Sequence, residues 1–236
     1  MQIQTYANAR DTARAAARYF QHCAQESVDT RGKFTFALSG GRTPWLMLEE
    51  LSQITLPWRH CHMFQVDERV APHGDETRNL THIDRTLLQE IPIPASAVHP
   101  MPVEAHDLQL NAAEYSKTLT TICGTPPILD AVLLGLGTDG HTASLVPNDP
   151  ALDVGSMYVG ITQVYQGTRR MTLTFPVLNH ALRLLWLITG EDKTEVLQQL
   201  LEGKSSIPAG RVSRHQAIIF ADQAAMADKH PNSQYV

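Results

Sequence analysis

The stretch Leu133-Leu134-Gly135-Leu136-Gly137-Thr138-Asp139-Gly140-His141-Thr142-Ala143-Ser144-Leu145-Val146-Pro147 is the most informative part of this 236-residue chain. An apolar run leads into three glycines that surround an acid and a histidine. A buried strand followed by tight backbone turns is a common way to present a titratable pair to a site. Such turns are also common without function, so this stretch alone leaves His141 open as a structural or a catalytic residue.

The composition is that of an ordinary globular protein, with a formal net charge of -5 and a pI near 6.1. This balance gives no general attraction to nucleic acids or acidic membranes, so any affinity for anions must come from a local cluster of cations. The length allows one large α/β domain with a substantial core. We expect a single domain over residues 1–236, because no Pro/Gly/Ser-rich linker or internal repeat divides the chain.

The cysteines, Cys23, Cys61 and Cys123, are odd in number and widely spaced, without a CxxC pair. They are typical of reduced residues in a cytosolic protein. The run His60-Cys61-His62 could suggest a metal cluster, but consecutive side chains of a strand point to opposite faces. We therefore predict no metal site.

No early segment combines a basic start with an apolar core, and no uncharged run approaches the roughly 18 residues that a bilayer span needs. We expect a soluble, cytoplasmic protein without a membrane partner.

Helical and strand-like patterns alternate along the chain. The pattern of apolar residues predicts helices over about 8–26, 45–51, 80–89, 107–122 and 190–201, and strands at 34–38, 61–66, 98–101, 129–134, 157–161, 171–174, 184–189 and 217–220. Several of these strands are apolar throughout, which favours a parallel sheet that is covered on both faces. The predicted fold is a single-domain, doubly wound α/β fold with a mainly parallel, Rossmann-like sheet.

The segment Ser39-Gly40-Gly41-Arg42-Thr43-Pro44 joins the strand at 34–38 to the next helix. Free backbone N–H groups, the positive end of a helix dipole and glycines that allow close approach together suit an anion. The segment is neither GxGxxG nor GxxxxGK[ST], which argues against a dinucleotide site or a P-loop. A plain turn between strand and helix is the alternative.

Polar residues follow three other predicted strands: Asp67-Glu68-Arg69, Asp139 to His141, and Gly190 to Lys193. The carboxyl ends of parallel strands meet at one edge, so these segments can line one cleft with the turn at Ser39. We interpret His73, in the loop after Arg69, as a solvated loop residue.

The residues in this predicted cleft suit a phosphorylated small molecule. The glycine turn, Lys193 and one or more of Arg42, Arg69 and Arg170 fit a phosphate, while Asp139 and His141 fit proton transfer or water activation. These residues alone leave isomerase, hydrolase and phosphatase open. The chain has no GxSxG or HExxH motif, which weighs against serine and zinc hydrolases and against Ser39 as a nucleophile.

With these motifs assembled, the sequence resembles the 6-phosphogluconolactonase family, within the group that includes glucosamine-6-phosphate isomerase (deaminase). The matching segments occur in the family order and are 38–44, 66–69 with Asn79, 134–147, 170–174 and 190–193. Arg69 and the acid-free run from Thr142 to Pro147 favour the lactonase branch, since the deaminase branch usually has a tyrosine and an acid at these places. Arg42 departs from the family, which commonly has serine there.

The resemblance implies hydrolysis of 6-phospho-D-glucono-1,5-lactone in the oxidative pentose phosphate pathway, without metal or organic cofactor. For this reaction we expect His141 to act as the base that activates water and Asp139 to orient it or support its charge. Arg69 would stabilise the oxyanion or bind substrate oxygens, and Asp67 would hold substrate hydroxyls or Arg69. The expected phosphate site consists of Ser39, Gly40, Gly41, Arg42, Thr43, Arg170 and Lys193.

The expected partner is a phosphorylated sugar lactone, the expected assembly is a monomer or homodimer, and no nucleic acid or membrane is expected to bind. A sugar-phosphate isomerase or deaminase and a non-catalytic sugar-phosphate sensor remain as alternatives.

Overall fold

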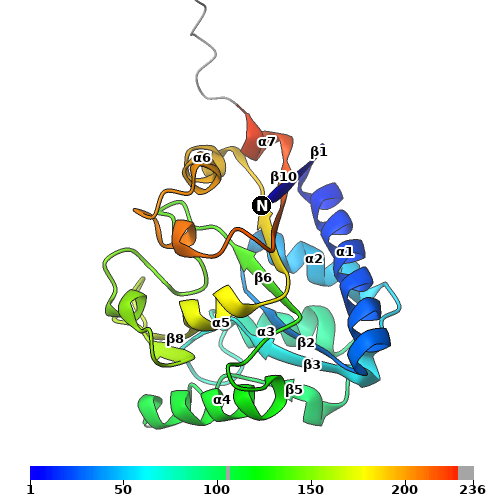
Figure 1. Ribbon diagram of the computed structural model, residues 1–236, viewed down its shortest axis with the longest axis vertical. Helices are drawn as coiled ribbons and strands as arrows, with labels where there is room; N and C mark the ends of the chain where they lie inside the picture. Colours follow the sequence, from blue (N-terminus) through cyan, green and yellow to red (C-terminus); the bar gives the residue numbers. More distant parts are fainter. Residues whose placement is uncertain (105–106, 228–236) are drawn as a thin grey trace, which may run out of the picture.

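The computed structural model describes residues 1–104 and 107–227 (Figure 1). The predicted domain over 1–236 therefore includes two short segments that lie outside the described residues.

A seven-stranded sheet forms the centre of the fold, and every pair of neighbours in it is parallel. Its order across the sheet is β1 (Gln2–Tyr6), β10 (Ala217–Asp222), β9 (Leu184–Ile188), β6 (Ala131–Gly135), β2 (Phe34–Leu38), β3 (Cys61–Gln65) and β5 (Val98–His99). The prediction of a mainly parallel α/β sheet is confirmed. The strands that carry the predicted site motifs, β9, β6, β2 and β3, are consecutive in this order.

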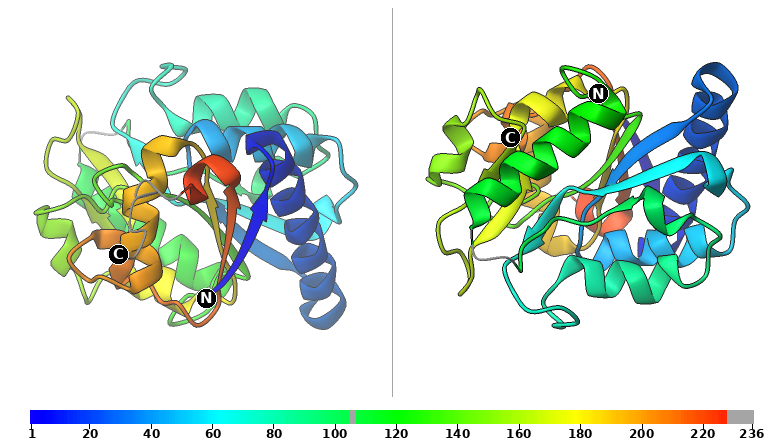
Figure 2. Two further views of the ribbon diagram at one scale, coloured as in Figure 1. Left: turned by 90° about the horizontal axis from the view of Figure 1, so that it is seen from above. Right: turned by 90° about the horizontal axis from the view of Figure 1, so that it is seen from below.

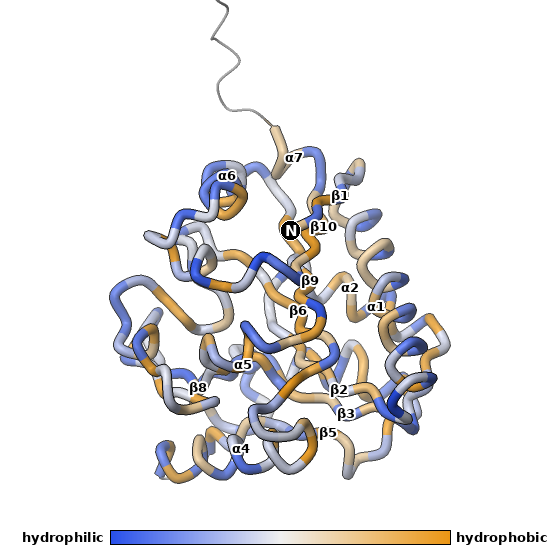
Figure 3. Tube along the Cα trace, in the orientation of Figure 1, coloured by the Kyte–Doolittle hydropathy of each residue, from blue (hydrophilic) through white to orange (hydrophobic). Residues whose placement is uncertain are grey.

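The apolar strands supply two separate cores, because successive side chains alternate between the faces of the sheet. On β2, Phe34 and Phe36 pack on one face and Ala37 on the other; on β6, Leu133 and Leu134 divide in the same way. The strands β6, β9 and β10 are correspondingly hydrophobic in Figure 3. This double burial explains why these strands read as continuous apolar runs.

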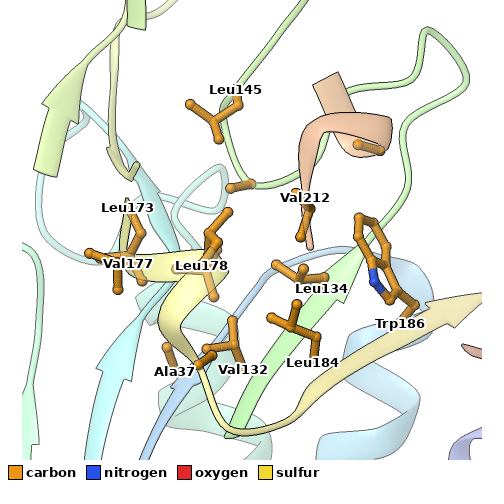
Figure 4. Close-up of a cluster of buried hydrophobic side chains, with 14 of the residues drawn as sticks. Ala37, Val132, Leu134, Leu145, Leu173, Val177, Leu178, Leu184, Trp186 and Val212 are labelled. Carbon is orange, nitrogen blue, oxygen red and sulfur yellow. The ribbon is translucent and has the colours of Figure 1, made fainter. Parts of the chain in front are cut away.

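Helices cover both faces, as Figures 1 and 2 show. The core beneath α1 (Ala9–Arg31) and α2 (Arg42–Ser52) occupies one face. The opposite core receives α4 (Leu108–Cys123), α5 (Phe175–His180) and α6 (Thr194–Glu202), and Figure 4 shows part of it around the fully buried Trp186. Two short helices, α3 (Asn79–Ile83) and α7 (Gln223–Met226), complete the set of α-helices in the described residues.

A second, antiparallel sheet was not predicted. It consists of β4 (Asp67–Arg69), β8 (Arg170–Leu173) and β7 (Val159–Ile161), in that order. The chain passes from β3 through Val66 into β4, so the polar triplet at 67–69 is itself a strand rather than the start of a loop. Leaving the main sheet here places Asp67 opposite Thr172 and Arg69 opposite Arg170.

Some predicted boundaries and elements were wrong. The first helix continues to Arg31, where Gly32 ends it in the left-handed conformation. The predicted helix over 80–89 is α3 followed by a π-helical turn at Asp84–Leu88. β1 was missed because its side chains are mostly exposed and polar, and its place in the sheet comes from backbone pairing with β10 and from the ring of Tyr6, which stacks on Phe220.

The cysteines are free thiols, with Cys23 and Cys61 buried and Cys123 half-buried. Burial raises the pKa of Cys61 to about 12 and that of Cys23 to about 11. In the described part of the chain, no group of three or more His, Cys, Asp or Glu side chains is placed to hold a metal ion. No helix within it is long and apolar enough to cross a membrane.

Replacing Leu134 by alanine tests the core packing of β6, the strand that leads into the loop at 135–141. Leu134 is fully buried, so the change removes apolar contacts and leaves a cavity, and the free energy of unfolding should fall by about 2–5 kcal/mol. Urea denaturation measures this loss. The matched control is Leu110→Ala, because Leu110 is 57% exposed and its loss should cost less than about 0.5 kcal/mol. Equal effects of the two changes would contradict the assigned core.

Candidate active site

A cavity of about 610 Å³ lies at the carboxyl ends of β2, β6, β9 and β10, beside β4. Open parallel sheets bind ligands at this edge. The sequence-predicted site residues that line the cavity are Ser39, Gly40, Gly41, Arg42, Thr43, Asp67, Arg69, His141, Arg170 and Lys193. The structure thus brings together five segments that are far apart in the sequence, and Asp139 is hydrogen-bonded to His141.

Asp139 and His141 form a close pair, with 2.5 Å between Oδ1 of Asp139 and Nδ1 of His141. The same carboxylate oxygen accepts the backbone N–H of His141, and Oδ2 accepts the hydroxyl of Tyr165 at 2.9 Å. Partial burial alone would raise the pKa of Asp139, but the hydrogen bonds from His141 and Tyr165 outweigh it and hold that pKa well below its usual value. Asp139 is therefore a carboxylate at neutral pH and orients the imidazole ring.

The glycines of this loop are needed for the pair to fit. A Cβ atom at Gly137 would overlap the ring of His141 and the carboxylate of Asp139. The loop is closed by backbone bonds from Gly137 N to His141 O and from Gly140 N to Gly137 O. Gly140 has φ +83°, a conformation that side chains other than hydrogen disfavour. The pattern Gly-x-x-Gly-His is thus a steric requirement of the turn.

Two arginines face the cavity from the antiparallel sheet, where Arg69 and Arg170 are direct cross-strand partners. Like charges at opposed positions repel each other and destabilise a sheet unless an anion lies between them. Burial lowers the pKa of Arg170, while the carboxylate of Asp67 opposes that shift. In both residues Nε is buried without a hydrogen-bond partner. This part of the cavity is suited to a negatively charged or strongly polar group.

Asp67 is buried and held on both sides. Its Oδ2 accepts the hydroxyl of Ser144 at 2.6 Å, and its Oδ1 accepts Nδ2 of Asn79 at 3.2 Å. Ser144 in turn lies 3.5 Å from Nη1 of Arg170. We expected Asp67 to hold either substrate hydroxyls or Arg69. Among the described residues, Asp67 makes no hydrogen bond to Arg69. Ser144 connects it to Arg170 instead.

The turn after β2 leads directly into α2, with Gly41 as its N-cap at φ +123° and without a side-chain cap. The amino end of this helix therefore leaves N–H groups for a ligand. Thr43 is hydrogen-bonded to Thr189 at 2.6 Å, which links the turn to the end of β9.

Lys193 lines the same cavity, with its Nζ 3.5 Å from Oδ2 of Asp192. Arg42 is 84% exposed and reaches Asp192 at 3.7 Å, so it lies at the rim rather than inside.

Sequence reasoning missed the role of Glu68, which is completely buried beneath the site. Its two oxygens accept the backbone N–H groups of Arg69, Asn79 and Leu80 and the amide of Gln65. Nε of Arg78 lies 3.3 Å from it, and Arg78 is only 2% exposed although the sequence places it in a polar loop. The sequence around a charged residue does not show whether its side chain is buried. The position of Glu68 between Asp67 and Arg69 was the only local sign that it belongs near the site.

Tyr165, Gln166, Asn79 and Ser144 also belong to this cavity or its walls and had no role in the sequence-based prediction. His73 is exposed and does not line the cavity, as expected for a solvated loop residue.

Comparison with known proteins identifies relatives over most of the chain. Residues 7–220 match the family model of glucosamine-6-phosphate isomerases/6-phosphogluconolactonase. A 6-phosphogluconolactonase of Synechocystis is 37% identical over 181 residues, which cover 74% of each chain. A 6-phosphogluconolactonase of Mycobacterium tuberculosis is 33% identical over 215 residues, covering 85% of this chain and 87% of the relative.

The fold has close counterparts among solved structures. The crystal structure of a 6-phosphogluconolactonase from Thermotoga maritima superposes with a TM-score of 0.84 at 25% sequence identity. The match covers 94% of this chain and 98% of the other.

Replacing Glu68 by alanine tests the buried network. The change leaves the Arg78 guanidinium and several backbone N–H groups buried without their partner, so the free energy of unfolding should fall by about 3–5 kcal/mol. Glu76→Ala is the control, because its ion pair with Arg85 is exposed to solvent and its loss should change the stability little. A loss at Glu68 no larger than at Glu76, measured by urea denaturation, would refute the assigned role.

Proposed function

We propose a mechanism that follows from the premise that the chain belongs to the glucosamine-6-phosphate isomerase/6-phosphogluconolactonase family. The reaction is the hydrolysis of 6-phospho-D-glucono-1,5-lactone to 6-phospho-D-gluconate, a step of the oxidative pentose phosphate pathway. A lactone is an activated ester. A positioned water, a base and a stabiliser of the oxyanion therefore suffice, without a covalent intermediate.

The observation that carries the mechanism is the pairing of Asp139 with Nδ1 of His141 at 2.5 Å. Because Asp139 is ionised and acts as the acceptor, the proton of the neutral imidazole resides on Nδ1. Nε2 is then the nitrogen that takes a proton, and His141 lines the cavity. We assign His141 as the base that deprotonates the attacking water and Asp139 as the carboxylate that fixes its tautomer and supports the imidazolium.

The water oxygen forms a bond to the lactone carbonyl carbon as His141 takes its proton. Negative charge develops on the carbonyl oxygen, and Arg69 is the cation we assign to it. The intermediate then expels the ring oxygen, which becomes the C5 hydroxyl after taking the proton back from His141. We assign Asp67, which is buried and held by Ser144 and Asn79, to the substrate hydroxyls.

For the phosphate we propose the turn formed by Ser39, Gly40, Gly41 and Thr43, together with Lys193. The free N–H groups at the start of α2 and the ammonium group of Lys193 border the same cavity, and both attract a phosphate. Arg170 adds a buried cation, and Arg42 adds one at the rim.

The setting of this activity is also part of the proposal. We propose that the chain acts as one domain in the cytoplasm, as a monomer or homodimer, without nucleic acid or membrane partners and without metal or organic cofactor. The net charge of -5 and the free cysteines support this setting.

Replacing His141 by alanine removes the proposed base. We expect kcat to fall by about 10²–10⁴-fold. The measurement is a coupled assay in which freshly generated 6-phosphogluconolactone is consumed faster than it hydrolyses spontaneously. His73→Ala, an exposed histidine outside the cavity, should retain the activity of the unaltered protein. A near-normal kcat in the His141 variant would disprove its assignment as the base. No acceleration by the unaltered, folded protein would overturn the function itself.

Replacing Lys193 by alanine tests the phosphate site separately. A group that binds the phosphate far from the reacting carbonyl contributes mainly to substrate binding, so we expect KM to rise about tenfold or more with a smaller change in kcat. Lys204→Ala serves as the control, because Lys204 pairs with Glu202 outside the cavity. A loss of kcat with unchanged KM would contradict this role of Lys193.

A further inference from the structure

Tyr165 lies between the proposed acid–base pair and the buried Arg170, and the mechanism above gives it no role. It belongs to the loop that joins β7 to β8 and lines the cavity. The loop closes on itself through the backbone bonds Tyr165 N to Thr168 O, at 3.0 Å, and Thr168 N to Tyr165 O, at 3.4 Å. Gln166 and Gly167, at its tip, have φ of +50° and +86°, as in a tight hairpin turn. This local pairing fixes the backbone from which the tyrosine side chain projects.

The hydroxyl of Tyr165 completes the surroundings of Asp139. It donates to Oδ2 at 2.9 Å, while Oδ1 accepts both Nδ1 and the backbone N–H of His141. Each carboxylate oxygen is therefore held by a different partner, and the carboxylate plane cannot rotate without breaking one of these bonds. The phenol ring also meets the imidazole of His141 edge-on, at 5.7 Å between centroids and 70° between planes.

The same ring supports the substrate-binding side of the cavity. Cζ of Arg170 lies 5.0 Å from the ring centroid, a distance at which a guanidinium is attracted to an aromatic face. The neighbouring Gln166 accepts Nη2 of Arg170 at 3.1 Å. Arg170 is buried, so its side chain depends on these contacts and on Ser144 for its direction. One hairpin thus touches Asp139, His141 and Arg170.

We propose that Tyr165 is a positioning residue of the lactonase site. Its hydroxyl sets the orientation and hydrogen-bonding strength of Asp139, and its ring holds the side chains of His141 and Arg170 in place. This inference rests on the proposed roles of Asp139 and His141. The hydroxyl withdraws negative charge from Asp139. Its removal leaves more of that charge to stabilise the protonated imidazole, so His141 binds its proton more tightly.

Other charged groups bear on His141 from the surrounding elements. Besides Asp139 on its own loop and Tyr165, those that line the same cavity are Arg42, Asp67, Arg69, Arg170, Asp192, Lys193 and Asp222. None of them is changed when Tyr165 is replaced by phenylalanine. A shift in the titration of His141 in that variant is therefore assigned to the lost hydroxyl.

Tyr165→Phe keeps the ring and removes only the hydroxyl. We expect the acid limb of the kcat–pH profile to move to higher pH by several tenths of a unit, with kcat on the plateau about 3–10-fold lower and KM nearly unchanged. Tyr165→Leu also removes the ring behind Arg170 and should additionally raise KM several-fold. Tyr6→Phe is the control, because its hydroxyl bonds to the exposed Gln4 outside the cavity, and it should leave kcat, KM and the pH profile unaltered.

An NMR titration of the His141 ring separates this inference from the proposed function, because it needs no turnover. The titration midpoint should be higher in Tyr165→Phe than in the unaltered protein, and Tyr6→Phe should show no shift. Identical midpoints in the unaltered protein and Tyr165→Phe would overturn the positioning role, whatever the activity. An unaltered protein that fails to accelerate lactone hydrolysis while the midpoint still moves would overturn the function and leave the Tyr165–Asp139–His141 coupling standing.

Discussion

The buried carboxylate of Glu68 is the constraint on which the site depends. A completely buried charge is tolerated only when hydrogen bonds and an opposite charge surround it. Glu68 meets this condition with the backbone N–H groups at the start of α3, the N–H of Arg69 and the guanidinium of Arg78. These bonds join β4 to the start of α3, while backbone pairing with β8 places β4 in the second sheet. The departure of β4 puts Arg69 opposite Arg170, and the position of α3 places Asn79 beside Asp67.

The cavity gathers positively charged side chains, although the chain as a whole carries a net negative charge. Arg69 and Arg170 lie on neighbouring strands of the small sheet, while Lys193 approaches from the end of β9. Asp67 and Asp192 compensate part of this positive charge from the cavity wall. The cavity therefore combines N–H groups of the turn at Ser39, the ammonium of Lys193, the guanidiniums of Arg69 and Arg170, and the imidazole of His141. These groups suit the phosphate and the reactive carbonyl of the proposed substrate.

Much of this arrangement could be predicted from the sequence because it is encoded by adjacent residues. Apolar runs predicted the parallel strands, and the topology then required that their carboxyl ends meet, so Ser39, Asp67, His141 and Lys193 were expected in one cleft. Gly137 signalled a tight turn at His141 for a steric reason that the structure shows in full.

The remaining features depend on contacts between distant segments. Tyr165 reaches Asp139 across 26 residues, and Asp67 reaches Ser144 across 77. Neither contact leaves a periodic or local signal. The small antiparallel sheet was missed for a related reason: its pairing is between 67–69 and 170–172, and the polar residues of β4 resemble a loop.

The surroundings of the serines in the cavity bear on how the ester bond is broken. Nucleophilic catalysis by serine needs a base within hydrogen-bond reach of the hydroxyl. The hydroxyl of Ser39 faces the carbonyl of Gly40 at 3.4 Å, and that of Ser144 donates to Asp67 at 2.6 Å. Within the described residues neither serine is hydrogen-bonded to a histidine, whereas His141 is already oriented by Asp139. A base that is held in place and lacks a serine partner is suited to act on water. This arrangement supports the proposal of direct hydrolysis, in which the Asp139–His141 pair acts on water rather than on a serine hydroxyl.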